Sequence, residues 1–280
     1  MTQTTNPLRQ FFRQPAIYLR LPSQGRFWPQ DALAMPENGE LPVLPMTAID
    51  EITYRTPDAL FNGQAVVSVI QSCIPNIRNA WVTPSVDIDA ILTAIRIASY
   101  GHELEIDSRC PKCEESDTYT LDLRQVLDGF RMPDYDQCVT NGDLEIHFVP
   151  LSYQQVHENN TMQFNDQRLL QMLPTSEMPE DEKVKMLADA LRKVTEMTVS
   201  TLTATISLIK TPGAIVNDAS HINDFLKNCD RALFNTIRDH VVDLRLNSEL
   251  KPLQIKCNSC QNEYSQPFTL DQANFFAPAS

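Results

Sequence analysis

Two short cysteine pairs constrain this chain more than any other feature. One pair is Cys110 and Cys113 in the segment CPKC, and the other is Cys257 and Cys260 in CNSC. A strand-like segment leads into each pair, and a polar turn and a second strand-like segment follow it. Each tight turn brings two sulfurs together, so two such turns can complete a tetrahedral Cys₄ site. The pattern predicts one structural zinc ion (Zn²⁺), closed to water and bound by all four cysteines.

The separation of the two pairs along the chain is unusually long. Cys113 and Cys257 are 144 positions apart, whereas the pairs of a compact zinc site are usually separated by about twenty residues or fewer. Because loop-closure entropy grows only with the logarithm of loop length, a long insertion between the pairs is thermodynamically acceptable. We expect a split zinc ribbon in which the ion ties the end of the chain to its middle.

Three other interpretations of these cysteines stay open. Disulfides are disfavoured because they are rare in the cytosol. A redox pair requires a setting that lowers the pKa of a thiol, whereas these pairs lie between strands, and acidic residues at 114, 115 and 117 adjoin the first. Two separate metal sites, each completed by a partner's ligands, are the third alternative. The other cysteines are interpreted as ordinary buried thiols: Cys73, Cys138 and Cys229.

Charge and hydropathy argue against several classes of protein. The chain has 280 residues and a formal net charge of −13, which repels nucleic-acid phosphates unless basic residues cluster. No segment approaches the roughly eighteen uninterrupted apolar residues of a membrane span, and the first residues lack the apolar run of a signal peptide. We expect a cytosolic protein with no membrane span and no nucleic-acid partner.

The pattern of apolar residues predicts an α+β fold with a mainly helical body, a split zinc-ribbon-like pair of β-knuckles and an extended N-terminal arm. In the arm, Ile17, Leu19 and Leu21 alternate as in a strand, and later prolines interrupt regular structure. The arm either wraps its own domain or lies on a partner. The expected segments are 1–55 (arm), 56–102 (helical), 103–150 (first knuckle and strands), 151–250 (helical insertion) and 251–280 (second knuckle and tail).

Capping signals predict two helices in the second of these segments. Thr56 is a suitable N-cap for a helix that ends near Cys73, and a second helix is expected over residues 85–101. Asp87 and Asp89 lie in the first turn of this second helix. Residues two apart on a helix point to different faces, so we interpret both as surface acids that stabilise the helix dipole and not as a catalytic pair.

The helical insertion contains a heptad-like seam. Apolar residues recur there with spacing 3-4-3 and, after a break near Thr198, recur again with the same spacing. They are Val184, Leu187, Leu191 and Val194, then Val199, Leu202, Ile206 and Ile209. We expect the seam either to pack within its own domain or to form an oligomer or partner contact. A last helix is expected over residues 220–246.

The sequence shows no catalytic motif. It has no GxSxG, GxxxxGK[ST], GxGxxG or HExxH segment, so the usual signatures of hydrolases, nucleotide-binding enzymes and zinc proteases are missing. His147 and His240 are interpreted as residues at the edge of the core. We expect no enzyme. The remaining enzymatic alternative is a hydrolase with a dispersed site, whose sign is a deep pocket that holds His147 or His157 beside a carboxylate.

Several long segments match a known family. They are RQPAIYLRLPSQGRFWP, PMTAIDEITYRTPDALFNGQAVVSVIQSCIPNI, IDAILTAIRIASYG leading into CPKC, and CNSC and ANFFAPAS near the end. On these residues the chain resembles the baseplate hub and hub-assembly family of T4-type contractile-tailed phages. The match is good over the first 125 residues, fair over the last 30 and loose in the helical middle.

The resemblance implies a non-enzymatic structural or assembly (chaperone-like) subunit of a myovirus tail baseplate hub. Other hub proteins and the tape-measure protein are the implied partners, in the host cytoplasm during assembly or in the virion tail baseplate. Only the four cysteines carry over as a site. Aromatic residues of the arm suit a groove on another subunit, and those of the tail either dock similarly or fold over their own core. These residues are Phe11, Phe12, Tyr18, Phe27 and Trp28 in the arm, and Phe275 and Phe276 in the tail.

The alternative is a cytosolic zinc-ribbon regulator that binds nucleic acid. Arg109, Lys112 and Lys256 flank the two knuckles, and a contiguous basic face around them would support this function. Three acids lie beside these three cations, so the sequence forms no evident phosphate track. The acidic balance and the aromatic arm favour the baseplate function.

Overall fold

The computed structural model describes residues 6–56, 63–172 and 179–268, and these fall into two compact units. The first unit draws on Met1–Ala80, Asp87–Phe130 and Leu250–Ser280, and the second on Trp81–Val86 and Arg131–Glu249. Helices make up the larger part of the regular secondary structure, and the sheets are small and antiparallel. The predicted α+β class is therefore confirmed. No helix in the described ranges is long and apolar enough to cross a membrane.

Much of the N-terminal arm packs on its own unit. A short 3₁₀ turn, η1 (Pro7–Phe11), precedes two strands, β1 (Ile17–Leu19) and β2 (Leu41–Val43), which pair in an antiparallel manner. The apolar side chains at 19, 21, 41 and 43 are all buried. Pro42 lies in β2 at no cost, because each strand of a two-stranded sheet has a free edge. Between β1 and β2, therefore, the arm wraps its own unit.

Helix α1 (Ala48–Tyr54) occupies a stretch that was expected to be extended. Thr47 and Asp50 form a capping box at its start, in which the Asp50 carboxylate accepts the Thr47 N–H at 2.7 Å. This reciprocal pairing satisfies two backbone donors that a helix start otherwise leaves unpaired. The expectation of an extended arm through residue 55 is wrong here. Ile49 and Ile52 are exposed, so α1 lacks a fully buried apolar stripe.

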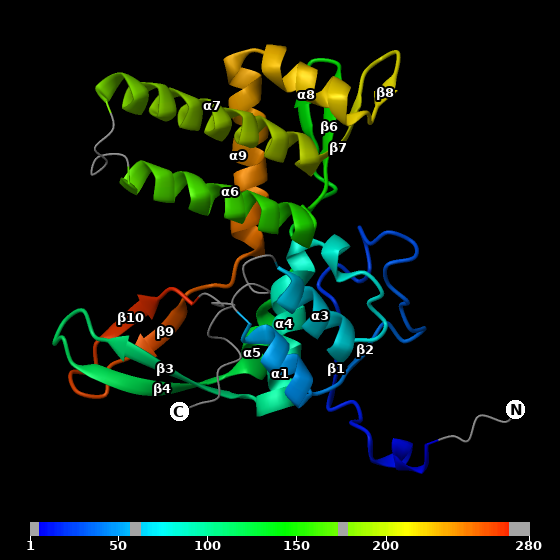
Figure 1. Ribbon diagram of the computed structural model, residues 1–280, viewed down its shortest axis with the longest axis vertical. Helices are drawn as coiled ribbons and strands as arrows, with labels where there is room; N and C mark the ends of the chain where they lie inside the picture. The colour runs from blue at the N-terminus through cyan, green and yellow to red at the C-terminus, as the bar shows by residue number, and fades with distance from the viewer. Residues whose placement is uncertain (1–5, 57–62, 173–178, 269–280) are drawn as a thin grey trace, which may run out of the picture. The chain divides into compact units, whose positions relative to one another are not determined.

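Two further helices of the first unit, α3 (Gln64–Cys73) and α4 (Ser85–Tyr100), appear in Figure 1. Both contribute many buried residues to its core. Helix α4 begins at Ser85 as predicted and ends one residue before the predicted limit, and its side chains Ile91 and Ile95 are completely buried. Helix α3 ends at Cys73 as predicted, but it begins after Gly63. The φ of 73° at Gly63 is one that glycine adopts readily. Thr56 is not helical, and the residues that follow it at 57–62 lie outside the described ranges.

Asp87 is not the surface acid that was predicted. Its carboxylate is completely buried and accepts hydrogen bonds from the Ser23 N–H at 2.9 Å, the Ser23 hydroxyl at 2.5 Å and Trp28 Nε1 at 2.8 Å. Burial raises the pKa of Asp87, and the hydrogen bonds from Ser23 and Trp28 oppose that rise. Asp89 is exposed as predicted. Asp87 therefore fastens the arm to α4, which explains why an acid is buried at a helix start.

Two antiparallel hairpins carry the knuckles. The first consists of β3 (Glu103–Arg109) and β4 (Ser116–Asp122), followed by α5 (Leu123–Gly129). The second consists of β9 (Leu253–Lys256) and β10 (Glu263–Gln266). Both hairpins belong to the first unit, and Figure 1 shows them side by side. The predicted strand–knuckle–strand pattern is confirmed in both places.

The second unit combines a four-stranded antiparallel sheet with helices. In the order of the sheet, its strands are β5 (Val139–Asn141), β6 (Leu144–Phe148), β7 (Ile206–Lys210) and β8 (Ile215–Val216). Its helices are α6 (Tyr153–Met172), α7 (Glu180–Thr205), α8 (Ala219–Asn228) and α9 (Arg231–Ser248). The single last helix that was predicted forms instead as α8 and α9. The Asp230 carboxylate caps α9 by accepting the N–H groups of Ala232 and Leu233.

The heptad-like seam divides into three different environments. Helix α7 runs through Thr198 without a break, and its later apolar residues, Val199 and Leu202, are buried. Ile206 and Ile209 are buried on strand β7 and not on a helix, so this part of the prediction is wrong. A spacing of three does not by itself distinguish a continuing helix from a strand that follows it. The four seam residues before Thr198 are exposed, so packing within the domain does not describe them.

Candidate metal centre

The two knuckles have the same backbone geometry. In the first, the Glu114 N–H donates to the Cys110 carbonyl at 2.9 Å, and the Cys110 N–H donates to the Glu115 carbonyl at 2.9 Å. In the second, Gln261 and Cys257 make the first of these bonds at 3.0 Å, and Cys257 and Asn262 make the other at 2.9 Å. The residue after the second cysteine is left-handed in both turns, with φ of 62° at Glu114 and 57° at Gln261. Equal spacing therefore produces equal turns.

The four sulfurs converge on one point. Cys110 Sγ lies 3.6 Å from Cys260 Sγ, Cys113 Sγ lies 3.6 Å from Cys257 Sγ, and all four sulfurs lie within 4.8 Å of one another. Zinc–sulfur bonds of about 2.3 Å in a tetrahedron place the sulfurs about 3.8 Å apart, whereas a disulfide requires about 2.05 Å. All four cysteines are free thiols. The cluster therefore fits a metal ion, and each turn faces the sulfurs of the other.

The surroundings shift the pKa values of Cys110 and Cys113 in opposite directions. Backbone N–H groups of Cys113 and Lys112 lower the pKa of Cys110 to about 6. The N–H of Glu115 acts in the same direction on Cys113, but the neighbouring sulfurs of Cys260, Cys257 and Cys110 outweigh it and raise that pKa to about 12. Metal-bound cysteines are thiolates. Four thiolates at these distances require a cation between them, and a divalent ion would supply that charge.

Protein contacts around the cluster hold the hairpins together. The hydroxyl groups of Ser108 and Tyr264 lie 2.6 Å apart, and the Asn258 amide donates to the Asp117 carboxylate. Ser108 is buried on β3, two positions before Cys110. These contacts position the cysteine-bearing turns through side chains that come from both hairpins.

Acidic residues dominate the surface of the first hairpin. Arg109 forms an exposed ion pair with Glu114 at 2.7 Å, and the exposed side of β3 carries Glu103, Glu105 and Asp107. Among the described residues of the two hairpins there is no contiguous basic face. The described surface of these hairpins therefore lacks the feature that would favour a nucleic-acid regulator.

The histidines have ordinary structural neighbours. His147 Nε2 lies 3.6 Å from a Glu145 carboxylate oxygen, and that carboxylate also pairs with Lys210 at 3.2 Å. His157 stacks on Tyr153. His240 is half-buried against Phe148, with ring centroids 4.6 Å apart. His147 and His240 therefore lie at the edge of the core of the second unit, as predicted.

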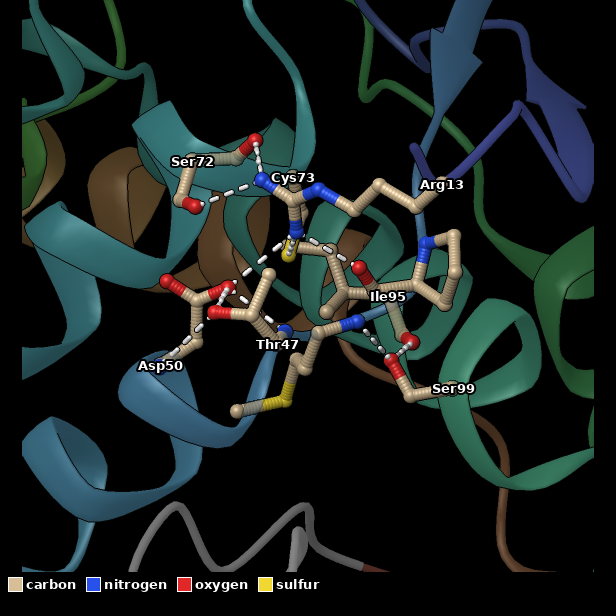
Figure 2. A network of polar contacts seen from close by, with 9 residues as sticks. Arg13, Thr47, Asp50, Ser72, Cys73, Ile95 and Ser99 are labelled. Atoms are coloured by element: carbon tan, nitrogen blue, oxygen red, sulfur yellow. Dashed lines mark hydrogen bonds and ion pairs between the residues drawn. The ribbon is translucent and has the colours of Figure 1, made fainter. Parts of the chain in front are cut away.

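A cluster around Arg13 was not predicted by any sequence motif. Figure 2 shows its guanidinium between the segment that begins α1 and the end of α3. One nitrogen donates to the Pro45 carbonyl at 2.6 Å and to Asp50 Oδ2 at 3.1 Å. The other donates to the Ser72 carbonyl at 2.7 Å and to its hydroxyl at 2.8 Å. Arg13 therefore joins the arm to α1 and α3.

The Asp50 carboxylate is the acidic member of the Arg13 cluster. Its burial tends to raise its pKa, but hydrogen bonds from Thr47 and Ser72 and the charge of Arg13 outweigh this effect and lower the pKa. Burial and the nearby Asp50 charge raise the pKa of the Cys73 thiol to about 12. Cys73 is therefore the ordinary buried thiol that was predicted. The threonine–aspartate spacing of the capping box was visible in the sequence, but its pairing with Arg13 was not.

The fold and the cysteine cluster define a protein of the α+β class in which two hairpins meet at one potential metal centre. The family described as T4 bacteriophage base plate protein matches residues 46–277 of this sequence. This match covers most of the chain, so the chain belongs to that family of phage baseplate proteins. The resemblance to T4-type baseplate proteins is thereby confirmed. Comparisons with curated proteins and with solved structures gave no match.

Proposed function

We propose that the protein is a non-enzymatic structural or assembly (chaperone-like) subunit of a myovirus tail baseplate hub, stapled by one zinc ion. The observation that carries the zinc proposal is the convergence of four sulfurs from turns 144 positions apart. The proposed ligands are Cys110, Cys113, Cys257 and Cys260. Four sulfur ligands leave no open position for water or substrate, which is typical of structural zinc and not of catalytic zinc.

The zinc ion would contribute to function by stabilising the first unit, to which both hairpins belong. When bound, it supplies cross-linking and charge neutralisation among the thiolates. The chain's own residues hold the two turns in matching conformations, and Ser108 and Tyr264 join the hairpins beside them. The second knuckle would thereby fix the C-terminal hairpin to the first knuckle, with the segment 131–249 between them in the sequence.

Contacts with other hub proteins and with the tape-measure protein would involve the start of the arm. Leu8, Phe11, Phe12 and Tyr18 are exposed, Phe11 to 77%. Phe27 and Trp28 are only half-buried and do not belong to this exposed set, and Trp28 is bound to Asp87. The exposed arm residues suit an apolar groove on another protein. Phe275 and Phe276 lie outside the described residues.

Elemental analysis of the purified full chain, together with its native mass, tests the zinc proposal. We expect one zinc per chain, lost when Cys257→Ser removes a ligand and retained in the matched control Cys138→Ser. An absence of metal, or two ions per chain, would contradict a shared site.

A complementation experiment tests the assembly proposal separately. A phage that lacks this chain should assemble heads but no complete baseplates in the host cytoplasm, and the wild-type chain should restore tails. Replacing both Phe11 and Phe12 by Ser should reduce this rescue, whereas Tyr153→Phe, a conservative change elsewhere, should not. Normal baseplates without the chain would rule out the proposed role.

A further inference from the structure

The first half of helix α7 exposes an apolar stripe. Val184, Leu187, Leu191 and Val194 are exposed to 64%, 43%, 58% and 38%. Their spacing of 3-4-3 is that of a helix seam that packs against another helix. Ala190, which points to a neighbouring side of the helix, is buried within the unit. The exposed stripe therefore lies next to a side of α7 that is buried within the unit.

Most charged residues of this part of α7 lie away from the stripe, whereas Lys183 borders it four residues before Leu187. At about 100° per residue, the positions 182, 185, 189, 192 and 196 project to the other side of the helix. Arg192 forms ion pairs there with Asp189 at 3.4 Å and with Glu196 at 3.2 Å, within its own helix. The four side chains of the stripe itself are therefore apolar, with Lys183 at its edge, and the ion pairs of Arg192 do not require a partner protein.

The stripe and its surroundings are nearly symmetric about Asp189. Moving away from Asp189 in both directions, the chain has alanine, then leucine two residues away and valine five residues away. The symmetry extends to lysines four residues away and glutamates seven residues away. The matched pairs are Ala188 and Ala190, Leu187 and Leu191, Lys185 and Lys193, Val184 and Val194, and Glu182 and Glu196.

We propose that the occupant of this stripe is α7 of a second copy of the chain, bound in the antiparallel direction. A two-fold contact joins the same patch on both subunits, and an antiparallel helix pair centred near Asp189 meets that requirement. Leu187 then faces Leu191 of the partner subunit, and Val184 faces Val194 of the partner subunit. Exposed Ala188 beside the seam lets the two helices approach closely. This proposal does not depend on the zinc site or on the hub function.

The size of the stripe determines how strong the contact is. Four side chains on one helix bury much less than the roughly 800 Å² per partner of a standard stable interface. The pair is therefore weak in dilute solution and forms at high concentration or when copies are held close together. Association must accordingly be measured over a wide range of concentration.

Sedimentation velocity of the full chain tests the contact between about 1 and 500 µM. The wild-type mass should rise towards twice that of the chain. Leu187→Glu, which places a charge at both central positions of the pair, should weaken association about a hundredfold. The matched control Ser200→Glu adds the same charge on the far side of α7 and should change association less than about twofold. Both variants should melt within about 2 °C of wild type, because both positions are exposed.

Mixing two variants tests the antiparallel direction. Val184→Glu and Val194→Lys should each weaken self-association, and an equimolar mixture should form a heterodimer because the two new charges face each other. A mixture of Val184→Glu with Val184→Lys should not recover. A monomer at all concentrations, full association of Leu187→Glu, or recovery only by the second mixture would overturn the proposal.

Discussion

The first unit contains two polar clusters that each join segments far apart in the chain. Four cysteines converge in one of them, and Arg13 meets Asp50, Pro45 and Ser72 in the other. The arginine cluster is complete, because protein acceptors receive its donors. The cysteine cluster consists of like groups that would repel one another if all were ionised, so in that state it would require an added cation. A cross-link that depends on a bound ion is lost all at once when the ion is removed, whereas a cluster of protein groups loses stability one contact at a time.

Removal of the metal should have the largest effect. Structural zinc binding contributes on the order of 10 kcal/mol, which is comparable with the total stability of a typical domain. Chelation, or Cys257→Ser, should therefore abolish cooperative unfolding of the first unit, as measured by circular dichroism during heating. Cys138→Ser should melt as wild type does. Identical melting curves with and without chelator would contradict a contribution of bound metal to the stability of the first unit.

Arg13→Ala should have the next largest effect. It removes the cation that pairs with Asp50, which keeps its hydrogen bonds from Thr47, and it takes the side-chain donor from the Pro45 and Ser72 carbonyls. The expected cost is about 2–3 kcal/mol of unfolding free energy. Urea denaturation measures this change. Arg9→Ala removes the same charge from an exposed position and should cost less than about 0.5 kcal/mol. Equal effects of the two substitutions would show that net charge, and not the cluster, is responsible.

Acid should reveal the contribution of Asp50. The pKa of Asp50 is lower in the folded chain than its ordinary value of 3.8, so the unfolded state binds more protons as the pH falls. The stability that Asp50 contributes is therefore fully present above about pH 5 and is lost as the pH falls through the folded pKa. The difference in unfolding free energy between wild type and Asp50→Asn should be constant above that pH and should shrink below pH 4. A difference that does not change with pH would contradict the assignment.

Trp28→Phe should have the smallest effect of the four. It removes one hydrogen bond to the buried Asp87 while the Ser23 bonds stay in place, which corresponds to about 1 kcal/mol. Differential scanning calorimetry should show a slightly lower melting temperature. Tyr18→Phe, at an exposed position, serves as the control and should leave the melting temperature unchanged.

Local signals in the sequence were sufficient for several elements. The Cys-x-x-Cys turns, the strands around them and the start of α4 were predicted correctly, because turn spacing and capping act between residues close together in the chain. The pairing of the two knuckles was predictable for a different reason. Four cysteines in two equal turns are complementary to one ion, so the motif itself indicates its distant partner.

The remaining features depended on contacts that no local pattern contains. The burial of Asp87 requires Ser23 and Trp28, and the role of Arg13 requires Asp50 and Ser72. The residue types of these partners are common and their positions follow no sequence motif, so the sequence does not indicate that they pair. Likewise, α7 gives way to β7 at Ile206 because residues 206–210 pair with β6. The sequence by itself determined the cysteine turns, the main helices and the family. Only the tertiary structure decided which polar groups are buried and which half of the seam is exposed, because burial depends on what packs against a residue.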